Sequence, residues 1–237
     1  MTSSPASVAH LIQEATTRIA AMLGLPRREA RLEARVLAAH AWQVDAAWLI
    51  AHDTDLQTAA DIATFESLLS QRLEGVPIAY LVGSREFYGR PFLVSNAVLI
   101  PRPDTELLVE LALAHLPIDQ AMDVLDLGTG SGCIAITLAL ERPRAHITAV
   151  DQSTAALAIA QHNADQLHAS VEFLPSDWFA ALRGRRFDLI VSNPPYIAAA
   201  DPHLARGDVR FEPLSALASG QNGLDGVSRL IHASSMH

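Results

Sequence analysis

The residues best suited to chemistry follow a short apolar segment. Residues 187–192 read FDLIVS, which is typical of a strand, and Asn193, Pro194, Pro195 and Tyr196 come directly after it. Proline lacks a backbone N–H and has a fixed φ, so the pair ends the strand and holds the backbone rigid just past the sheet. A plain strand stop would need no more than this, but the same rigid turn can also hold a flat, polar group of a substrate.

A glycine-rich segment, DLGTGSG at 126–132, lies between a predicted strand and a predicted helix. Gly128, Gly130 and Gly132 allow a sharp turn and a close approach of a ligand to the backbone, while the following helix offers its N-terminal amides. The G-x-G-x-G spacing differs from the G-x-G-x-x-G of dinucleotide sites, and Asp126 precedes it. We predict a cofactor site here, with a purely structural turn as the alternative.

Three more polar or aromatic residues follow the next two predicted strands. Asp151 ends HITAVD and can accept hydrogen bonds from the two hydroxyls of a ribose, or cap the helix from 153 onward. Asp177 and Trp178 follow VEFLPS and can frame an adenine, although Trp178 alone is typical of a core aromatic. The carboxyl ends of parallel strands meet at one edge of a sheet, so we expect these residues beside the glycine loop.

The composition is that of a globular chain. The 237 residues are 50% hydrophobic, and the net charge of −9 argues against nucleic-acid binding, although all 17 basic residues are arginine. Cys133 is the single cysteine, which excludes an internal disulfide and a thiolate zinc cage. We expect no metal and no membrane span, and we expect a soluble, cytoplasmic protein.

The order of predicted elements indicates two parts. Apolar residues recur at spacings of three and four from residue 8 to about 81, which predicts a bundle of helices at 8–23, 27–40 and 45–51 and around 62–73. Short β-type runs around YGRP predict a hairpin at the joint, and Asp104 or Thr105 is expected to cap the next helix. Strands and helices then alternate, which is typical of a parallel sheet in an α/β fold.

The combination of DLGTGSG, AVD, SDW and NPPY resembles the class I S-adenosylmethionine methyltransferases. The segment GVPIAYLVGSREFYGRPFLVSNAVLIPRPDTELLVE resembles the one that precedes the catalytic domain in the protein-(glutamine-N5) methyltransferases of peptide chain release factors, and the likeness runs from about residue 8 to about 230. It implies a helical domain for release-factor recognition (1–82), a β-hairpin linker (83–101) and a Rossmann-like, S-adenosylmethionine-dependent methyltransferase domain (102–237).

The resemblance also implies roles for single residues. The substrate would be the glutamine of the GGQ motif, with its nitrogen oriented by the side-chain oxygen of Asn193 and the carbonyl of Pro194 and its amide plane packed on Tyr196. The expected catalytic residues are Asn193, Pro194 and Tyr196; the expected cofactor contacts are Asp126, Gly128, Thr129, Gly130, Ser131, Gly132, Asp151, Asp177, Trp178 and Asn193; and the expected substrate contacts are Asn193, Pro194, Pro195, Tyr196, Arg102 and Pro103.

One feature leaves other functions open. About 40 residues follow NPPY and contain no convincing strand, so we expect the last strands of the family's sheet to be missing and the fourth strand to be an exposed edge. The alternatives are a methyltransferase acting on a ribosomal-protein glutamine or a nucleic-acid base, or an inactive, cofactor-binding fragment. A nicotinamide-dependent oxidoreductase is disfavoured by the glycine spacing. The oligomeric state and the preferred release factor do not follow from the sequence.

Overall fold

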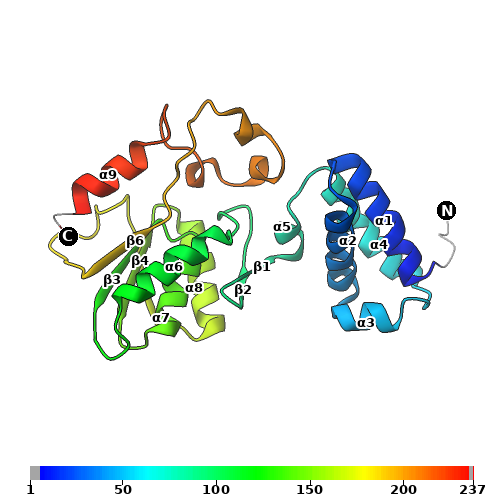
Figure 1. The fold of residues 1–237 in the computed structure, drawn as a ribbon, viewed down its shortest axis with the longest axis horizontal. Helices are drawn as coiled ribbons and strands as arrows, with labels where there is room; N and C mark the ends of the chain where they lie inside the picture. Colours follow the sequence, from blue (N-terminus) through cyan, green and yellow to red (C-terminus); the bar gives the residue numbers. More distant parts are fainter. Residues whose placement is uncertain (1–5, 235–236) are drawn as a thin grey trace. The chain divides into compact units, whose positions relative to one another are not determined.

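The computed structural model describes residues 6–234 and residue 237. Contacts between Cα atoms divide the chain into two compact units, with the boundary between Val82 and Gly83. The first unit is helical and the second contains a parallel sheet, which confirms the predicted α/β class (Figure 1). None of the helices in the described part of the chain combines the length and the apolar character needed to cross a membrane.

The described residues of the first unit form five helices. These are α1 (Val8–Leu23), α2 (Arg27–Trp42), α3 (Ala46–Ala51), α4 (Ala59–Leu73) and α5 (Ile78–Val82). The side chains of Asp45 and Thr58 accept backbone N–H groups at the starts of α3 and α4, and Gly24 ends α1 with a φ of 67°. The four helices predicted from the apolar spacing are present, and α5 is an addition.

The apolar stripes of these helices form the core of the first unit. Ile19 of α1, Leu37 of α2 and Phe65 of α4 are fully buried in one cluster. Each such side chain contributes about 1.5–3 kcal/mol when it leaves water. The buried guanidinium of Arg72 pairs with Glu33 at 2.8 Å and so joins the end of α4 to α2.

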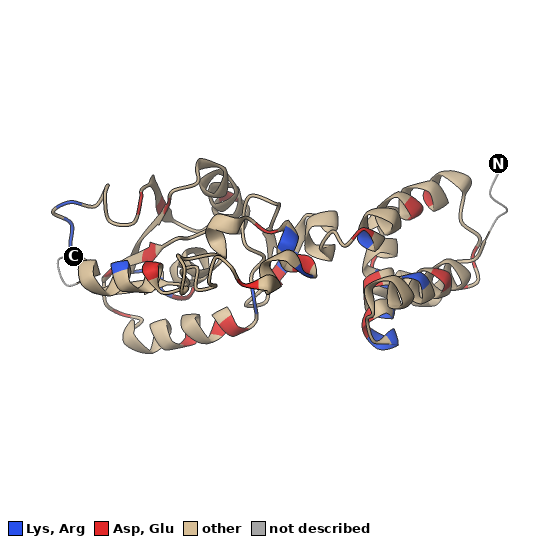
Figure 2. Ribbon diagram, turned by 90° about the horizontal axis from the view of Figure 1, so that it is seen from above, with Lys and Arg blue, Asp and Glu red and all other residues tan. Residues whose placement is uncertain are grey.

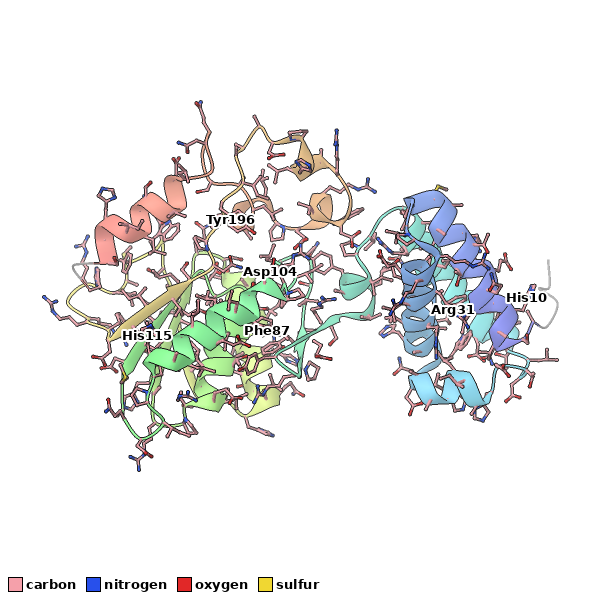
Figure 3. The ribbon with its side chains drawn as sticks, in the orientation of Figure 1. His10, Arg31, Phe87, Asp104, His115 and Tyr196 are labelled. Atoms are coloured by element: carbon pink, nitrogen blue, oxygen red, sulfur yellow. The ribbon has the colours of Figure 1, made fainter. Side chains whose placement is uncertain are left out.

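The second unit begins with the predicted hairpin. Strands β1 (Ser84–Phe87) and β2 (Arg90–Leu93) pair antiparallel, and the two turn residues, Tyr88 and Gly89, both have positive φ, as a type I′ turn requires. Phe87 belongs to the core cluster of the second unit (Figure 3). The hairpin is therefore part of the second unit.

Four parallel strands form the sheet of the second unit in the order β5-β4-β3-β6. They are β3 (Asp123–Leu127), β4 (His146–Asp151), β5 (Val171–Pro175) and β6 (Leu189–Ser192), and the helices among them are α6 (Asp104–His115), α7 (Cys133–Glu141) and α8 (Thr154–Leu167). Because β3, α7, β4, α8 and β5 progress in one direction across the sheet, right-handed crossovers put α7 and α8 on the same face.

The two faces of the sheet have separate apolar clusters. On the helix face, Val124 of β3 packs with Ile134 of α7 and Val109 of α6. On the other face, Leu125 of β3 packs with Leu182, because successive strand residues point to opposite sides. The second face is covered by the segment between β5 and β6 and by α9 (Asp225–Ser234), which lies beside the sheet in Figure 1.

The strand β6 is an edge strand, and the described residues after it add no strand to the sheet. They form the short 3-10 helices η1 (Pro202–Ala205), η2 (Asp208–Phe211) and η3 (Leu214–Ala216), followed by α9. The strand is shorter than predicted, since it begins at Leu189. Phe187 lies before it and is half-buried in the cluster of the second face.

The predicted cap of α6 is wrong. Neither Asp104 nor Thr105 is the cap residue, since the helix begins at Asp104 and Pro103 precedes it without a side-chain hydrogen bond. The backbone provides the acceptors in its place: Thr105 N donates to the carbonyl of Arg102 and Glu106 N to that of Pro103. The carboxylate of Glu106 is thereby free of a capping role and accepts the N–H of Tyr88 in the hairpin turn at 2.8 Å.

Candidate active site

The sheet topology creates one crevice at the carboxyl ends of its central strands. From β3 the chain proceeds through β4 to β5 on one side, and then returns to place β6 on the other side of β3. In open α/β sheets, ligands bind where the strand order reverses in this way. The glycine loop follows β3 and Asn193 follows β6, so the two motifs flank the crevice. The hydroxyl of Ser192 donates to the Leu127 carbonyl at 2.7 Å and joins the two strand ends.

A cleft of about 1010 Å³ opens at this crevice. Most of the residues predicted to act line it: Gly128, Thr129, Gly130, Ser131, Asp151, Asp177, Trp178, Asn193, Pro194, Pro195 and Arg102. Asp126, Gly132, Pro103 and Tyr196 are not among its lining residues. The strand ends therefore bring together four sequence motifs that are spread over about seventy residues of chain.

The glycines of the loop have different reasons to be glycine. Gly128 and Gly130 have φ of 76° and 56°, and a Cβ at either position would meet no atom within 4 Å, so their backbone borders open space. Gly132 has a φ of 81°, and its Cβ would lie 2.8 Å from Ile136 Cδ1 and 3.1 Å from the Cβ of Ala160. Gly132 thus allows α7 and α8 to pack closely, whereas the first two glycines shape the cleft.

Asp151 joins the loop to the start of α8. One carboxylate oxygen accepts the N–H of Gly130 at 2.9 Å, and the other accepts the N–H of Ser153 at 2.9 Å. The cap of α8 itself is Ser153, whose hydroxyl accepts the N–H of Ala156 at 3.1 Å. Asp151 is half-buried at the edge of the cleft, and its carboxylate faces the backbone of the loop.

Asp126 lies beneath the loop, outside the cleft. Its side chain is fully buried, one oxygen accepts the Thr129 hydroxyl at 2.7 Å, and the other oxygen, Oδ1, has no hydrogen-bond partner. Burial raises the pKa of Asp126 to about 7, the hydrogen bond from Thr129 opposes the rise, and the charge of Asp151 adds to it. A buried carboxylate with one unpaired oxygen is suited to a cation bound just above it.

A threonine side chain of α6 orients Asn193. Its side-chain N–H₂ donates to the Thr105 hydroxyl of α6 at 3.3 Å, which leaves the side-chain oxygen available as an acceptor. Thr105 is buried, and Asn193 and Pro194 are half-buried. Each proline fixes its own φ and lacks a backbone N–H, and the residue before a proline is restricted to extended conformations, so the backbone at this turn has little freedom.

A second cavity, of about 850 Å³, adjoins the cleft. Six residues line both: Leu99, Arg102, Thr105, Asn193, Pro194 and Ala216. Tyr196 lines the second cavity but not the cleft, and it is 67% exposed. It lies on the side of the sheet where α6 begins at Asp104 (Figure 3). Pro103 is exposed and lines neither cavity. Asn193 and Pro194 therefore lie at the junction of two cavities, one beside the glycine loop and one beside Tyr196.

Trp178 and Asp177 close the cleft beyond β5. Trp178 has a φ of 54°, lines the cleft, and also packs on the cluster of the second face. Asp177 is exposed and lies 3.5 Å from the guanidinium of Arg229 in α9.

The described residues offer neither a metal site nor a nucleophilic thiol. No group of three or more histidine, cysteine, aspartate and glutamate side chains is placed to hold an ion among them. Burial raises the pKa of Cys133 to about 12, so its thiol stays protonated at neutral pH.

Comparison with known proteins identifies the family of this chain. Residues 10–83 match the family model of the PrmC N-terminal domain, and residues 104–207 match that of the methyltransferase small domain. The release factor glutamine methyltransferase of Bordetella pertussis is 54% identical over 208 residues, which cover 87% of this chain and 76% of that protein. The chain belongs to the release factor glutamine methyltransferase family.

A second relative and one solved structure are also similar to this chain. The release factor glutamine methyltransferase of Escherichia coli K12 is 46% identical over 226 residues, covering 95% of this chain and 79% of that protein. The T. thermophilus 16S rRNA N2 G1207 methyltransferase is similar over 49% of this chain and 33% of its own, with 28% identity and a TM-score of 0.42. The family assignment makes this chain an S-adenosylmethionine-dependent glutamine methyltransferase.

The residues of the cleft fit S-adenosylmethionine. The open space at Gly128 and Gly130 admits a ligand against the loop backbone, and the Asp151 carboxylate can accept from ribose hydroxyls. Asp126, beneath the loop, would add negative charge below a cofactor that carries positive charge when its carboxyl group is ionised.

Three polar residues near the site were missed by the sequence analysis. Thr105 orients Asn193, and Glu212 pairs with Arg102. Buried Asn163 of α8 donates to the carbonyls of Ser131 and Leu93 at 2.8 and 3.1 Å and accepts the Leu93 N–H at 2.7 Å, which joins the hairpin to the glycine loop. These contacts span 32 to 110 residues of chain, so no local spacing reveals them.

Proposed function

We propose that this chain transfers the methyl group of S-adenosylmethionine to the side-chain amide nitrogen of the glutamine in the GGQ motif of peptide chain release factors. The observation that carries the proposal is the position of Asn193 and Pro194 at the junction of the two cavities. The cofactor would occupy the cleft beside the glycine loop, and the glutamine side chain would enter through the second cavity. The two reactants would then meet at the residues that both cavities share.

The chain's own residues would act by orientation. An amide nitrogen is a weak nucleophile because its lone pair is delocalised into the carbonyl. The side-chain oxygen of Asn193 and the carbonyl of Pro194 would each accept one N–H of the substrate amide, which fixes the nitrogen and aims its lone pair. The bound cofactor supplies an electrophilic methyl group. Orientation of this kind can supply on the order of 7–11 kcal/mol of barrier reduction in favourable cases.

The remaining site residues would bind the two reactants. Tyr196, exposed at the second cavity, can pack on the amide plane of the glutamine, and Trp178 and Asp177 can contact the adenine. No strong base is needed, since the methylated nitrogen becomes more acidic and can release its proton to water through the open cavity. Arg102 would contact the substrate at the junction.

The recognition of the release factor is assigned to the first unit, residues 1–82, and the catalytic domain to residues 102–237, with the hairpin segment 83–101 leading into that domain and packing in its core. The match of residues 10–83 to the PrmC N-terminal domain supports this division. Release factors act in translation, so the proposed reaction takes place in the cytoplasm.

The test is a substrate panel. The chain is incubated with methyl-labelled S-adenosylmethionine and, separately, with a purified release factor, with ribosomal proteins and with tRNA. We expect label in the release factor alone. Label in a ribosomal-protein glutamine or in tRNA, with none in the release factor, would replace the proposed substrate. Cofactor binding with no transfer to any of them would indicate a binding protein without this activity.

A further inference from the structure

The two cavities share a wall that comes from residues 209–217. Pro213 lines the cleft, Leu217 lines the second cavity, and Ala216 lines both. The end of this segment is held by the loop after β6, because Ile197 N donates to the Leu217 carbonyl at 2.9 Å. Its middle is held by a side chain from within the segment.

That side chain is Glu212. It is 0% exposed, one of its oxygens accepts the N–H of Ile100 at 3.0 Å, and the other accepts from the guanidinium of Arg102. Both partners lie in the loop that leads from the hairpin into α6. A single carboxylate therefore joins two segments that are more than a hundred residues apart in the chain.

Stability alone is a poor explanation for this pair. Removing a carboxylate from water is costly, and replacing a buried ion pair with apolar residues of similar volume is often neutral or stabilising. Breaking the pair from one side leaves an uncompensated buried charge. Here the carboxylate is fully buried and the guanidinium of Arg102 is partly exposed at the cavities, so the pair is well suited to fixing one arrangement of two chain segments.

The arrangement that Glu212 fixes is the one around the reacting atoms. Arg102 lines both cavities, and its neighbours in that shared lining are Asn193, Pro194 and Thr105. We propose that Glu212 is a positioning residue for methyl transfer: it holds Arg102 and the wall of residues 209–217 in place at the junction of the cavities. The inference rests on the proposed function, and it assigns to Glu212 no contact with either reactant.

The consequence is a selective loss of turnover. A displaced wall widens the junction, so the glutamine nitrogen is no longer held in line with the methyl group. A misplacement of about 1 Å costs on the order of 100-fold in rate. Pro213 and Ala216 also line the cleft, but the contacts of Glu212 are with Ile100 and Arg102, whereas the glycine loop follows β3 and Asp151 ends β4. Cofactor affinity should therefore change less than turnover.

The test uses Glu212→Gln, which keeps an acceptor for Ile100 N, and Glu212→Met, which fills similar volume without charge. For each variant we would measure amide hydrogen exchange, the cofactor Kd and kcat/KM on a release factor. We expect faster exchange in residues 209–217, nearly unchanged Kd, and kcat/KM lower by on the order of 100-fold. Arg102→Met should lower kcat/KM by a smaller factor in Glu212→Met than in the wild-type chain, because part of the contribution of Arg102 depends on Glu212.

Glu141→Gln is the matched control. It breaks another glutamate–arginine pair of the second unit, Glu141 with Arg90 at 2.7 Å, and neither residue lines a cavity. It should leave all three measurements near wild type. Unchanged exchange of residues 209–217 in both Glu212 variants would overturn the inference, as would equal losses of cofactor affinity and turnover. A wild-type chain that methylates no release factor would refute the proposed function, while the exchange data would still decide the role of Glu212.

Discussion

At the scale of single residues, the burial of Asp126 changes the pH at which its carboxyl group ionises. Strand β3 alternates its side chains, so Leu125 and Leu127 face one side of the sheet and Asp126 faces the helix side, under the glycine loop. The sequence analysis expected this carboxylate in the cofactor site. It lies instead below the cleft, and its influence on a bound cation would act through the low dielectric of the core.

The pH dependence of stability should reveal this burial. Because the pKa of Asp126 is raised to about 7 in the folded chain, the unfolded chain loses this proton first as pH rises from about 4 to 7. Stability therefore falls across that window, by on the order of 4 kcal/mol from this group, and stays lower above it. Asp126→Asn should remove the fall. Urea unfolding at pH 4 to 8 measures it, and a pH-independent difference between variant and wild type would contradict the raised pKa.

Asp151→Ala should weaken cofactor binding. The variant removes the carboxylate proposed to accept from the ribose hydroxyls, and charge-assisted hydrogen bonds of this kind contribute about 1.5–3 kcal/mol. It also frees the N–H of Gly130, so some of the loss would come from a less ordered loop. Calorimetric titration with S-adenosylmethionine gives the Kd. An unchanged Kd would exclude Asp151 from the binding site.

Asn193→Ala should lower kcat much more than it raises the cofactor Kd. In the proposed mechanism the side-chain oxygen would act on the nitrogen that is methylated, so its contribution would appear in the transition state. Thr105→Val is a companion variant, since it removes the hydroxyl that orients Asn193, while Thr105→Ser keeps it. Steady-state kinetics on a release factor measure the effect. Near-normal turnover of Asn193→Ala would contradict the role.

At the scale of elements, the parts governed by local patterns were predictable. The helix predicted from residue 153 onward is present as α8 at Thr154–Leu167, with Ser153 in place of Asp151 as its N-cap. The glycine loop follows from the change between strand and helix periods. The contacts of Glu212, Asn163 and Thr105 were not predictable, since each depends on how distant segments pack. Even α6 takes its first acceptors from a preceding backbone turn.

The glycine loop allows a matched pair of substitutions. Gly132→Ala combines a φ of 81° with a Cβ only 2.8 Å from Ile136, so it should lower the free energy of unfolding by strain and by overpacking together, about 1–3 kcal/mol each. Gly130→Ala, with open space at its Cβ, should cost strain alone but project a methyl into the cleft. Urea unfolding and cofactor titration separate the two effects. Equal stability losses would contradict the packing role of Gly132.

At the scale of the whole molecule, the charge bears on the class of substrate, and the topology bears on where the two reactants would meet. Acidic and basic residues are interspersed along the helices of both units, and the chain carries a net charge of −9 (Figure 2). Such a balance favours a protein substrate over nucleic acid. The topology places the glycine loop after β3 and the NPPY turn after β6, two neighbouring strands, so that the proposed cofactor and substrate sites would meet at one junction.

The most direct test of this account is to locate the transferred methyl group. Wild-type chain and Asn193→Ala, both shown to bind S-adenosylmethionine, are incubated with a purified release factor and methyl-labelled cofactor, and the digested product is analysed by peptide mass spectrometry. The account predicts one methyl group on the glutamine of the GGQ motif with the wild-type chain and a strongly reduced yield with the variant. Methyl groups on another residue, or an equal yield from the variant, would contradict it.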